Sequence, residues 1–176
     1  EMCKETGHET DSGYYGFWYV LRDLKSEYVQ DSNLHRRRKY RGLQVDIFPM
    51  ESHQNRLLHR LASTLGYRLV EHPLLRSVSA NVGYRYQLLT DCLFPAFRAI
   101  GRISASDKMS LGPGCPWYYS IATRDIFPLR TAEFEGYPFP VPHDAATYLS
   151  IVYGDWRKVP DTDSVKTHDT KFLFFE

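Results

Sequence analysis

The sequence predicts an α+β fold, with short strands in the first third, a helical segment in the middle, and a hairpin followed by a helix near the C-terminus. Aromatic and β-branched residues gather early, leucines recur at helical spacing between positions 55 and 103, and glycine and proline punctuate positions 110–154. The chain has 176 residues, of which 43% are hydrophobic, so it can bury the core of one substantial domain.

The first third predicts three strands. Residues 1–12 are polar, show no periodic pattern and predict a loop. The aromatic run Tyr14–Asp23 predicts a strand, and residues 23–32 predict a turn and a second short strand. In Gly42–Phe48 every second residue is aliphatic, which predicts a third strand with Asp46 on the other face. Pro49 ends this strand because proline cannot donate a hydrogen bond to a sheet.

Residues 55–103 predict two to four helices inserted between the strands. Apolar residues recur every three or four positions in 55–70 and 84–103, and Pro95 is expected to kink or split the second run. A glycine- and proline-rich loop is expected at Ser110–Trp117. The predicted apolar faces are Leu57, Leu58, Leu61 and Leu65 in the first run, and Leu88, Leu89, Cys92, Leu93, Ala96, Phe97 and Ile100 in the second.

The C-terminal part predicts a hairpin and a helix. Residues 132–142 place Gly136 between two short runs, and three prolines restrict the hairpin to a sheet edge. Residues 143–154 predict a helix with Asp144 as its N-terminal cap and Gly154 at its C-terminal stop. Residues 161–176 predict a polar tail, so the predicted domain spans residues 1–160.

Charge and composition exclude several classes of protein. The net charge is +1, which gives no whole-molecule attraction to nucleic acid or membranes, and no run of 18 apolar residues predicts a transmembrane segment. The three cysteines are irregularly spaced and predict neither a disulfide framework nor a zinc site. Five of the 22 basic residues nevertheless lie within residues 35–41, on a predicted loop.

Two identical tetrapeptides, Asp46–Pro49 and Asp125–Pro128, raise the question of which aspartate does chemistry. The first ends a predicted strand, the second precedes the hairpin, and the segments between share no similarity, so no internal repeat is predicted. A carboxylate held at a strand end is a typical magnesium ligand in phosphoryl transfer, because magnesium prefers oxygen and neutralises phosphate charge. The structural alternative for Asp46 is a solvent-facing aspartate on an edge strand.

Two segments together resemble the LicD family, which includes the fukutin-like proteins. They are "GLQVDIFPM" (Gly42–Met50) and "RDIFPLRTAEFEGYPFPVPHDAATYLSIVYGDWRKVPD" (Arg124–Asp161). The order FEG, VP, YL, YGD and VP at this spacing carries most of the resemblance, and "LRD" at Leu21–Asp23 adds to it. The resemblance covers roughly Tyr15 to Pro160.

The resemblance implies a nucleotidyltransferase-like mixed sheet and an enzyme. It implies transfer of a phosphate-linked group, such as phosphocholine or a polyol phosphate, from a CDP-activated donor to a glycan or lipopolysaccharide-type acceptor. Asp46 matches one of the three family carboxylates and is the predicted catalytic residue and ligand of Mg²⁺ or Mn²⁺. The other two, an Asp-x-Asp pair, belong upstream of Glu1, so the chain is expected to be a piece of a longer protein or to derive from a member that lost the pair. Metal binding is expected only with that pair present, and the chain alone is expected to be inactive.

The residues predicted to bind substrate lie around two motifs. Ordinary surface charge is the structural alternative for the basic residues, and a helix stop is the alternative for the "YGDW" motif at 153–156. The predicted residues are Arg22, Lys25, Arg38, Lys39, Arg41, Tyr153 and Asp155.

Two other functions remain open at this stage. One is a non-catalytic scaffold or substrate-binding relative of the same family, in which Asp46 is a remnant. The other is an RNA-binding module that uses the basic loop and exposed tyrosines, although no nucleic-acid partner is expected from the net charge. The resemblance leaves the compartment open as well, because bacterial relatives act in the cytoplasm and animal relatives in the Golgi lumen.

Overall fold

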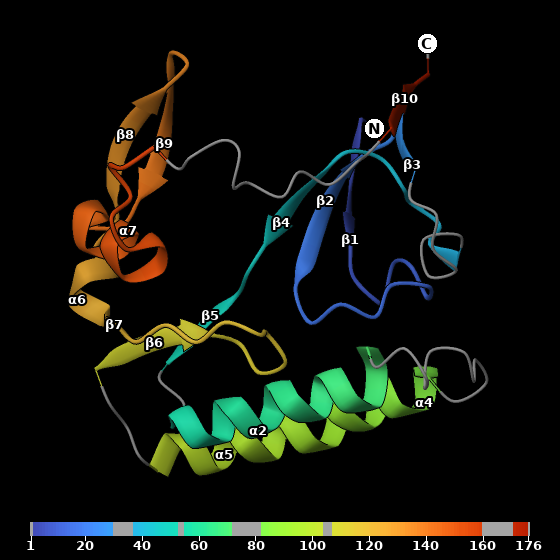
Figure 1. The fold of residues 1–176 in the computed structure, drawn as a ribbon, viewed down its shortest axis with the longest axis horizontal. Helices are drawn as coiled ribbons and strands as arrows, with labels where there is room; N and C mark the ends of the chain where they lie inside the picture. Colours follow the sequence, from blue (N-terminus) through green and yellow to red (C-terminus); the bar gives the residue numbers. More distant parts are fainter. Residues whose placement is uncertain are drawn as a thin grey trace.

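The computed structural model describes residues 2–29, 37–52, 55–71, 82–103, 107–159 and 171–175. In these segments the chain is a mixed α/β structure, with several small antiparallel sheets beside a pair of long helices (Figure 1). The predicted α+β class is confirmed at this level. No helix in the described segments is both long enough and apolar enough to cross a membrane.

The N-terminal sheet has the strand order β1–β2–β4, and neighbouring strands are antiparallel. The strands predicted within 14–23 and 42–48 are confirmed, but the loop predicted for residues 1–12 is wrong, because residues 3–6 pair with β2. Backbone groups make these hydrogen bonds, so a polar segment without periodicity can add an edge strand. The three strands are β1 (Cys3–Thr6), β2 (Tyr19–Asp23) and β4 (Gln44–Ile47).

Two further sheets join distant parts of the chain. β3 (Ser26–Val29) pairs with β10 (Lys171–Phe174), so part of the predicted polar tail is a strand, while residues 160–170 and 176 lie outside the described residues. β5, β6 and β7 form a sheet that lies between the helix pair and the other strands (Figure 1). Their bounds are β5 (Met50–Ser52), β6 (Lys108–Leu111) and β7 (Ile121–Ala122).

The helices predicted for residues 55–103 are confirmed in the described part. α2 and α5 lie side by side (Figure 1). Pro95 is the second residue of α5, directly after a wider π-helical turn, which suits a proline that lacks an N–H and crowds the turn before it. The elements are α2 (Arg56–Gly66), η1 (Tyr67–Glu71), α4 (Val82–Gln87), η3 (Leu88–Leu93) and α5 (Phe94–Ile103).

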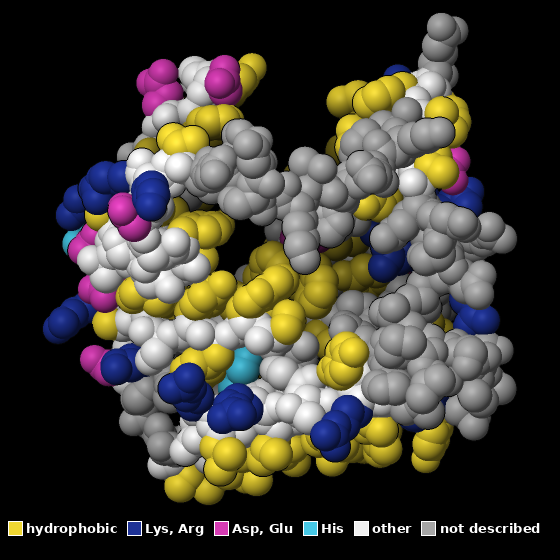
Figure 2. All heavy atoms as spheres, viewed as in Figure 1, with side chains coloured by type: hydrophobic (Ala, Val, Ile, Leu, Met, Phe, Trp, Pro, Cys, Tyr) yellow, Lys and Arg dark blue, Asp and Glu magenta, His cyan; other side chains and the backbone are white. Residues whose placement is uncertain are grey.

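The apolar face predicted for the first helix is correct only in part: Leu65 packs against the core, whereas Leu57 and Leu61 do not. Leu57 and Leu61 are 63% and 46% exposed, so hydrophobic side chains line the outer edge of the helix pair (Figure 2). Small residues face inward instead, because the ring of Phe17 lies against α2, and a Cβ at Gly66 would be 2.8 Å from that ring. The buried positions of α2 are His59, Ala62 and Gly66.

The core lies between the helix pair and the aromatic segment 14–18. Phe17 stacks on Tyr86, with 5.4 Å between ring centroids, and meets Phe94 edge to face at 5.3 Å. The rings therefore fix the segment that leads into β2 against the helices. The buried members of this core are Ala62, Val70, Val82, Tyr86, Leu89 and Phe94.

The glycine- and proline-rich loop runs from β6 into the interior. Gly112–Cys115 is buried, and Ser63 of α2 donates a hydrogen bond to the carbonyl of Cys115 (2.6 Å). Gly114 has φ +90°, and a Cβ at this position would lie 2.5 Å from Cγ of Phe17. Glycine is required here by both its backbone conformation and its close approach to the ring.

The predicted C-terminal hairpin and helix are confirmed. Glu135 (φ 51°) and Gly136 (φ 79°) form the turn, a pair of positive φ values typical of a type I′ hairpin. Asp144 caps the last helix, since its Oδ1 accepts the N–H of Thr147 (3.0 Å), and Gly154 (φ 71°) ends it. The elements are α6 (Thr123–Ile126), β8 (Arg130–Phe134), β9 (Tyr137–Val141) and α7 (Ala145–Tyr153).

Gly114→Ala is expected to lower the free energy of unfolding by about 2–4 kcal/mol, because it adds a clash with Phe17 to backbone strain. Gly136→Ala is the matched control: its φ is also positive, but nothing lies within 4 Å of the new Cβ, so a loss of about 1 kcal/mol is expected. Urea denaturation measures both. Equal losses would contradict the close contact between Gly114 and Phe17.

Stability is expected to fall below about pH 6.5 because of His59. This side chain is 1% exposed, and burial lowers its pKa from the usual 6.5. Hydrogen bonding to the backbone of Cys115 and Trp117 acts in the opposite direction and raises the pKa, but burial has the larger effect. The unfolded chain therefore takes up the proton first as pH falls. His59→Phe should flatten the dependence of Tm on pH between about 7 and 5. His143→Gln, at a half-buried histidine outside the core, serves as control, and an unchanged slope in the His59 variant would exclude this origin.

Candidate functional site

Asp46 lies on β4, directly opposite Val20 of β2. Cross-strand partners share a face of the sheet, and so do residues two apart on one strand, which places Asp46 on the same face as Arg22. The Asp46 side chain is exposed, and its Oδ1 accepts a hydrogen bond from Nε2 of Gln44 (2.9 Å). The carboxylate is thus held on a strand beside a cation, rather than on a loop.

Arg22 is the largest fully buried side chain in the described part of the chain, with 0% exposure. Its Nη1 donates to the carbonyl of Gly42 (3.1 Å), whereas Nε and Nη2 are buried without a hydrogen-bond partner. Gly42 permits this close packing, because a Cβ there would lie 1.7 Å from the carbonyl oxygen of Asp23. Burying a guanidinium with unused donors is costly, so this side chain calls for an explanation beyond packing.

Three more side chains complete a polar cluster around Arg22. Asp11 is 2% exposed, and its Oδ2 accepts the N–H groups of Lys39 (2.8 Å) and Tyr40 (3.3 Å), which fixes the basic segment. The guanidinium of Arg38 lies over the ring of Tyr14, 5.5 Å from its centroid. We call Asp11, Tyr14, Arg22, Arg38 and Asp46 the Arg22 cluster.

The charges of the Arg22 cluster act on one another. Burial is the main cause that lowers the pKa of Arg22, the charge of Arg38 lowers it further, and Tyr14, Asp11 and Asp46 oppose both effects. Burial also raises the pKa of Tyr14 well above its usual value, so this phenol stays neutral and can donate a hydrogen bond. Its hydroxyl donates to the carbonyl of Trp18 (2.8 Å). The arrangement holds fixed positive charge next to the Asp46 carboxylate.

The structure places the remaining predicted basic residues at the surface near the cluster. Lys25 is exposed in the turn between β2 and β3. The ammonium of Lys39 lies 5.0 Å from the ring centroid of Tyr40, and Arg41 forms an ion pair with Glu27 (3.1 Å). These three predicted residues therefore lie in segments next to those that form the Arg22 cluster.

Tyr153 and Asp155 are not part of this group. Both are exposed, at the end of α7 and just after it. Figure 1 shows α7 beside β8 and β9, on the far side of the molecule from β2. The structure therefore does not bring these two predicted substrate-binding residues together with the Arg22 cluster.

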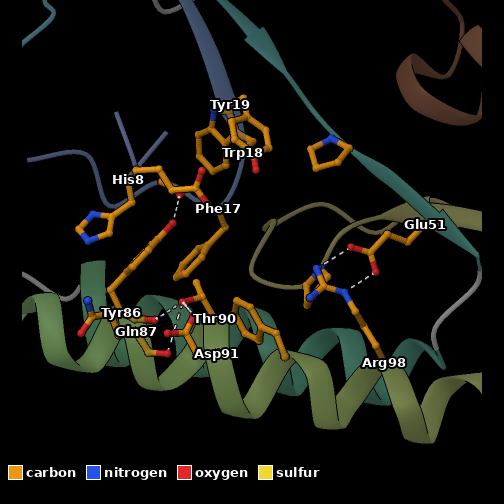
Figure 3. A pocket seen from close by; sticks show the side chains of 15 residues that line it. His8, Phe17, Trp18, Tyr19, Glu51, Tyr86, Gln87, Thr90, Asp91 and Arg98 are labelled. Carbon is orange, nitrogen blue, oxygen red and sulfur yellow. Dashed lines mark hydrogen bonds and ion pairs between the residues drawn. The ribbon is translucent and has the colours of Figure 1, made fainter. Parts of the chain in front are cut away.

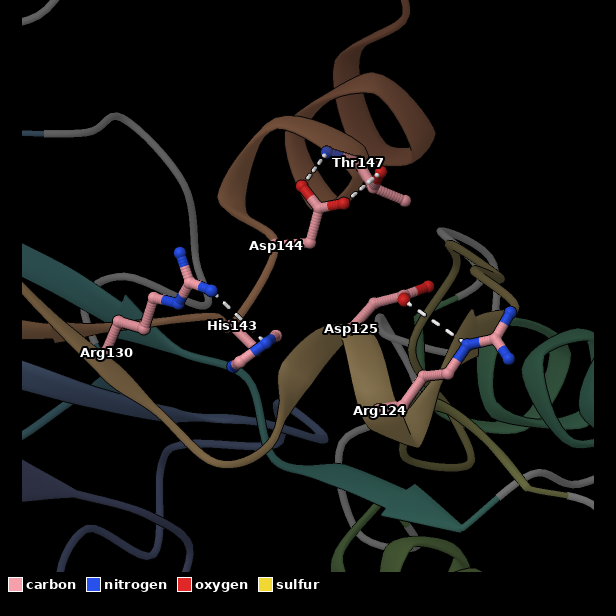
Figure 4. Close-up of polar contacts among 6 residues, drawn as sticks. All are labelled: Arg124, Asp125, Arg130, His143, Asp144 and Thr147. Atoms are coloured by element: carbon pink, nitrogen blue, oxygen red, sulfur yellow. Dashed lines mark hydrogen bonds and ion pairs between the residues drawn. The ribbon is translucent and has the colours of Figure 1, made fainter.

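The two identical tetrapeptides have different conformations. Asp46 and Ile47 belong to β4, whereas Asp125 and Ile126 belong to the short helix α6. The carboxylate of Asp125 faces its own neighbour Arg124 (3.7 Å; Figure 4). The backbone carbonyl of Asp125 accepts the N–H of Asp144 (2.8 Å). The second motif thus anchors the start of α7, which agrees with a structural role.

The surroundings of Asp46 do not supply the ligands of a metal ion. Among the described residues, no three side chains of His, Cys, Asp or Glu gather closely enough to hold a metal ion. Asp46 is a single carboxylate beside the side-chain amide of Gln44. Magnesium is bound by several oxygen ligands in an octahedral arrangement, so this carboxylate alone is not sufficient. The described residues therefore do not form a magnesium site on their own.

Sequence reasoning missed a cavity of about 520 Å³ between the segment 8–19 and the helices. Tyr86, Thr90 and Asp91 form its floor, and Glu51 and Arg98 close one end with two hydrogen bonds of 2.7 and 2.6 Å (Figure 3). These residues come from distant segments and follow no spacing motif. The only signal in the sequence was the density of aromatic residues in Tyr14–Tyr19.

Comparison with known proteins finds no relative: no family model matches the chain, and no curated protein or solved structure is similar to it.

Arg22→Met is expected to leave the free energy of unfolding within about 1 kcal/mol of the wild type, or to raise it, because the variant removes a buried charge and two unused donors. Arg98→Met is the contrasting variant. It leaves Glu51 without its bidentate partner and should lose about 1–3 kcal/mol.

Chemical denaturation of both variants under the same conditions tests this. A loss above about 2 kcal/mol for Arg22→Met would show that the fold needs this cation. The functional interpretation of its burial would then be unnecessary.

Proposed function

We propose that this chain belongs to a LicD-type phosphotransferase of nucleotidyltransferase-like fold. Such an enzyme moves a phosphate-linked group, phosphocholine or a polyol phosphate, from a CDP-linked donor to a glycan acceptor. The observation that carries the proposal is the Arg22 cluster, in which a fully buried guanidinium with unused donors lies on the same sheet face as Asp46. The "VDIFP" and "FEG…YGD" segments that resemble the family supply the reaction class.

The Arg22 cluster can stabilise the negative charge of a phosphoryl group during transfer. Charge on the transferred phosphoryl group is stabilised best by cations that are already in place. Arg22 is fixed by its hydrogen bond to Gly42 and by complete burial, and Arg38 is held nearby over Tyr14. Both supply a positive potential that needs no rearrangement during reaction. Phosphate contacts themselves fall to the exposed basic side chains at this surface, Lys25 and Lys39.

Asp46 is the proposed catalytic carboxylate. In the family that the chain resembles, this position is one of three carboxylates that bind Mg²⁺ or Mn²⁺. A complete ligand set would need carboxylates from outside the described residues, since these do not form a metal site by themselves.

A non-catalytic, substrate-binding relative is the second candidate. The exposure of Asp46 and its hydrogen bond from Gln44 favour this candidate, because a remnant carboxylate would look the same. In that case the Arg22 cluster would bind a phosphate-linked group without transferring it. The assay below separates the two candidates.

Asp46→Asn is expected to lower transfer by about a thousandfold or more, because it removes a carboxylate that acts on the transition state. Asp125→Asn removes the same charge from the same tetrapeptide and should be tolerated, at a stability cost of about 1 kcal/mol or less. The measurement is transfer of radiolabel from CDP-choline and CDP-ribitol by the full-length protein, with melting temperatures to show that both variants fold.

The outcomes separate the alternatives. Equal losses in the two variants would show that the second motif has been misinterpreted. Full activity of Asp46→Asn would remove Asp46 from the mechanism. Donor binding without any transfer by the wild-type protein would favour the non-catalytic relative.

A further inference from the structure

The second helical run has an apolar stripe on its exposed face. The chain is helical without a break from Val82 to Ile103, over a length of roughly 30 Å. Residues three or four positions apart share one face of a helix, and most of those on the exposed face of this run are apolar. They are Tyr84, Leu88, Cys92, Pro95, Ala96, Ala99, Ile100 and Ile103.

α2 adds apolar side chains on its own side of the helix pair. Leu57 and Leu61 lie one turn apart and are both exposed. Figure 2 shows hydrophobic side chains in a row along the outer edge of the pair. We call these two leucines and the apolar residues of the second run the outer stripe. No described strand lies beyond this edge in Figure 1, so a flat surface can approach it.

Arginines border the outer stripe. Arg56 and Arg60 lie one turn apart on the exposed face of α2, directly beside its two leucines. Figure 2 shows Lys and Arg side chains over α2 next to the hydrophobic row. Arg68 of η1 and Arg102 of α5 are exposed as well. Among the described residues, none of these four arginines forms an ion pair with a carboxylate.

The charge of this part of the chain is mostly positive. Residues 55–103 contain seven arginines, no lysine and only two acidic residues, Glu71 and Asp91. The whole chain has a net charge of only +1, so this positive charge is local and is offset elsewhere in the sequence. Arginine always carries its charge and donates paired hydrogen bonds to phosphate groups. The outer edge therefore combines an apolar stripe with groups that bind phosphate.

We propose that the outer edge of the helix pair binds the surface of an anionic lipid bilayer. The outer stripe would lie at the boundary between the headgroups and the acyl chains, as amphipathic helices do when they lie in the plane of a membrane. The arginines would contact the lipid phosphates, because their long side chains can follow an apolar surface and still reach the headgroups. This arrangement requires no membrane-spanning helix.

A second copy of the chain fits this edge less well. An isologous contact would bring the arginines of both copies into one interface. Asp91 is the only carboxylate among the described side chains of the helix pair, so these arginines would lack partners and would repel one another. A nucleic acid would satisfy the arginines but would leave the outer stripe in contact with water. An anionic bilayer matches both the charge and the apolar surface.

This inference stands without the proposed phosphotransferase activity. The residues of the Arg22 cluster lie in the segments 11–22 and 38–46, outside the helix pair. Binding to vesicles can be measured in the absence of any donor or acceptor. A failure of transfer would therefore not affect this proposal, and a failure of vesicle binding would not affect the proposed function.

The experiment measures co-sedimentation of the full-length protein with vesicles. One set contains phosphatidylcholine alone, and the other contains phosphatidylcholine and phosphatidylglycerol in a two-to-one mixture. Binding to the anionic vesicles is expected to be at least about tenfold stronger, because each arginine near the surface adds attraction. Added salt should weaken it. Equal binding to both sets, or no binding to either, would overturn the proposal.

Two double variants locate the surface. Arg56→Gln with Arg60→Gln should weaken binding to the anionic vesicles about tenfold, because two charges are lost. Ile100→Gln with Ile103→Gln should weaken it about tenfold or more, because apolar area no longer leaves water. All four side chains are exposed, so folding should be retained, which circular dichroism checks. Unchanged binding in either double variant would overturn the proposal.

Matched controls lie in the C-terminal part of the chain. Arg124→Gln with Arg130→Gln removes two exposed arginines, and Phe134→Gln with Tyr137→Gln removes two rings that are each 68% exposed. Both controls should bind the anionic vesicles as the wild type does. A loss equal to that of the matching helix variant would show that the effect is not specific to the outer edge and would overturn the proposal.

Sedimentation equilibrium without vesicles tests the competing occupant. The wild-type protein is expected to show no association that depends on the outer stripe. A dimer that Ile100→Gln with Ile103→Gln dissociates would assign this edge to a second copy of the chain and would overturn the proposal.

Discussion

The ring of Phe17 is the contact on which the rest of the structure depends. It lies where three other segments meet: Gly66 ends α2, Gly114 belongs to the buried loop after β6, and Tyr86 and Phe94 lie on the second helical run. Two of these neighbours are glycines that admit the ring only because they lack a side chain. Phe17 therefore connects the N-terminal sheet to the helix pair, and its position determines where β2 begins two residues later.

The cavity and the Arg22 cluster are both attached to this same strand entry. Trp18 and Tyr19 line the aromatic cavity, while Val20 and Arg22 of β2 share their face with Asp46. One wall of the cavity is therefore fixed by the core, because Trp18 and Tyr19 directly follow Phe17 in the chain. The Arg22 cluster is also stabilised by Asp11, whose carboxylate accepts two backbone N–H groups of the basic segment. That carboxylate therefore helps to hold the segment carrying Arg38 over Tyr14.

The sequence predicted well those elements that are determined by neighbouring residues along the chain. The C-terminal helix could be predicted with its cap Asp144 and its stop Gly154, because capping depends on the residues at the ends themselves. The buried face of α2 could be predicted only in part, through Leu65, because leucine spacing indicates only that a helix has an apolar stripe. Which stripe is buried was decided by a distant ring that requires small residues opposite it.

The pairing of β10 with β3 and the edge strand β1 were missed for a related reason: neither has a periodic pattern, and both are held by backbone hydrogen bonds to strands found elsewhere. For the site, motif spacing pointed to Arg22, Arg38 and Asp46, which do meet, and also to Tyr153 and Asp155, which lie elsewhere.

The charges on the two sides of the segment 14–22 are opposite. One side holds buried positive charge beside Asp46, and the other holds aromatic rings beside Glu9 and Asp91. Glu51 forms a bidentate hydrogen bond with Arg98, the one arginine among the described residues that line the cavity. The carboxylates of Glu9 and Asp91 would repel a phosphate, whereas the guanidinium groups of Arg22 and Arg38 would attract it. On the proposed function, a CDP-linked donor is therefore expected at the face of β2 and β4 that carries Asp46, and not in the cavity.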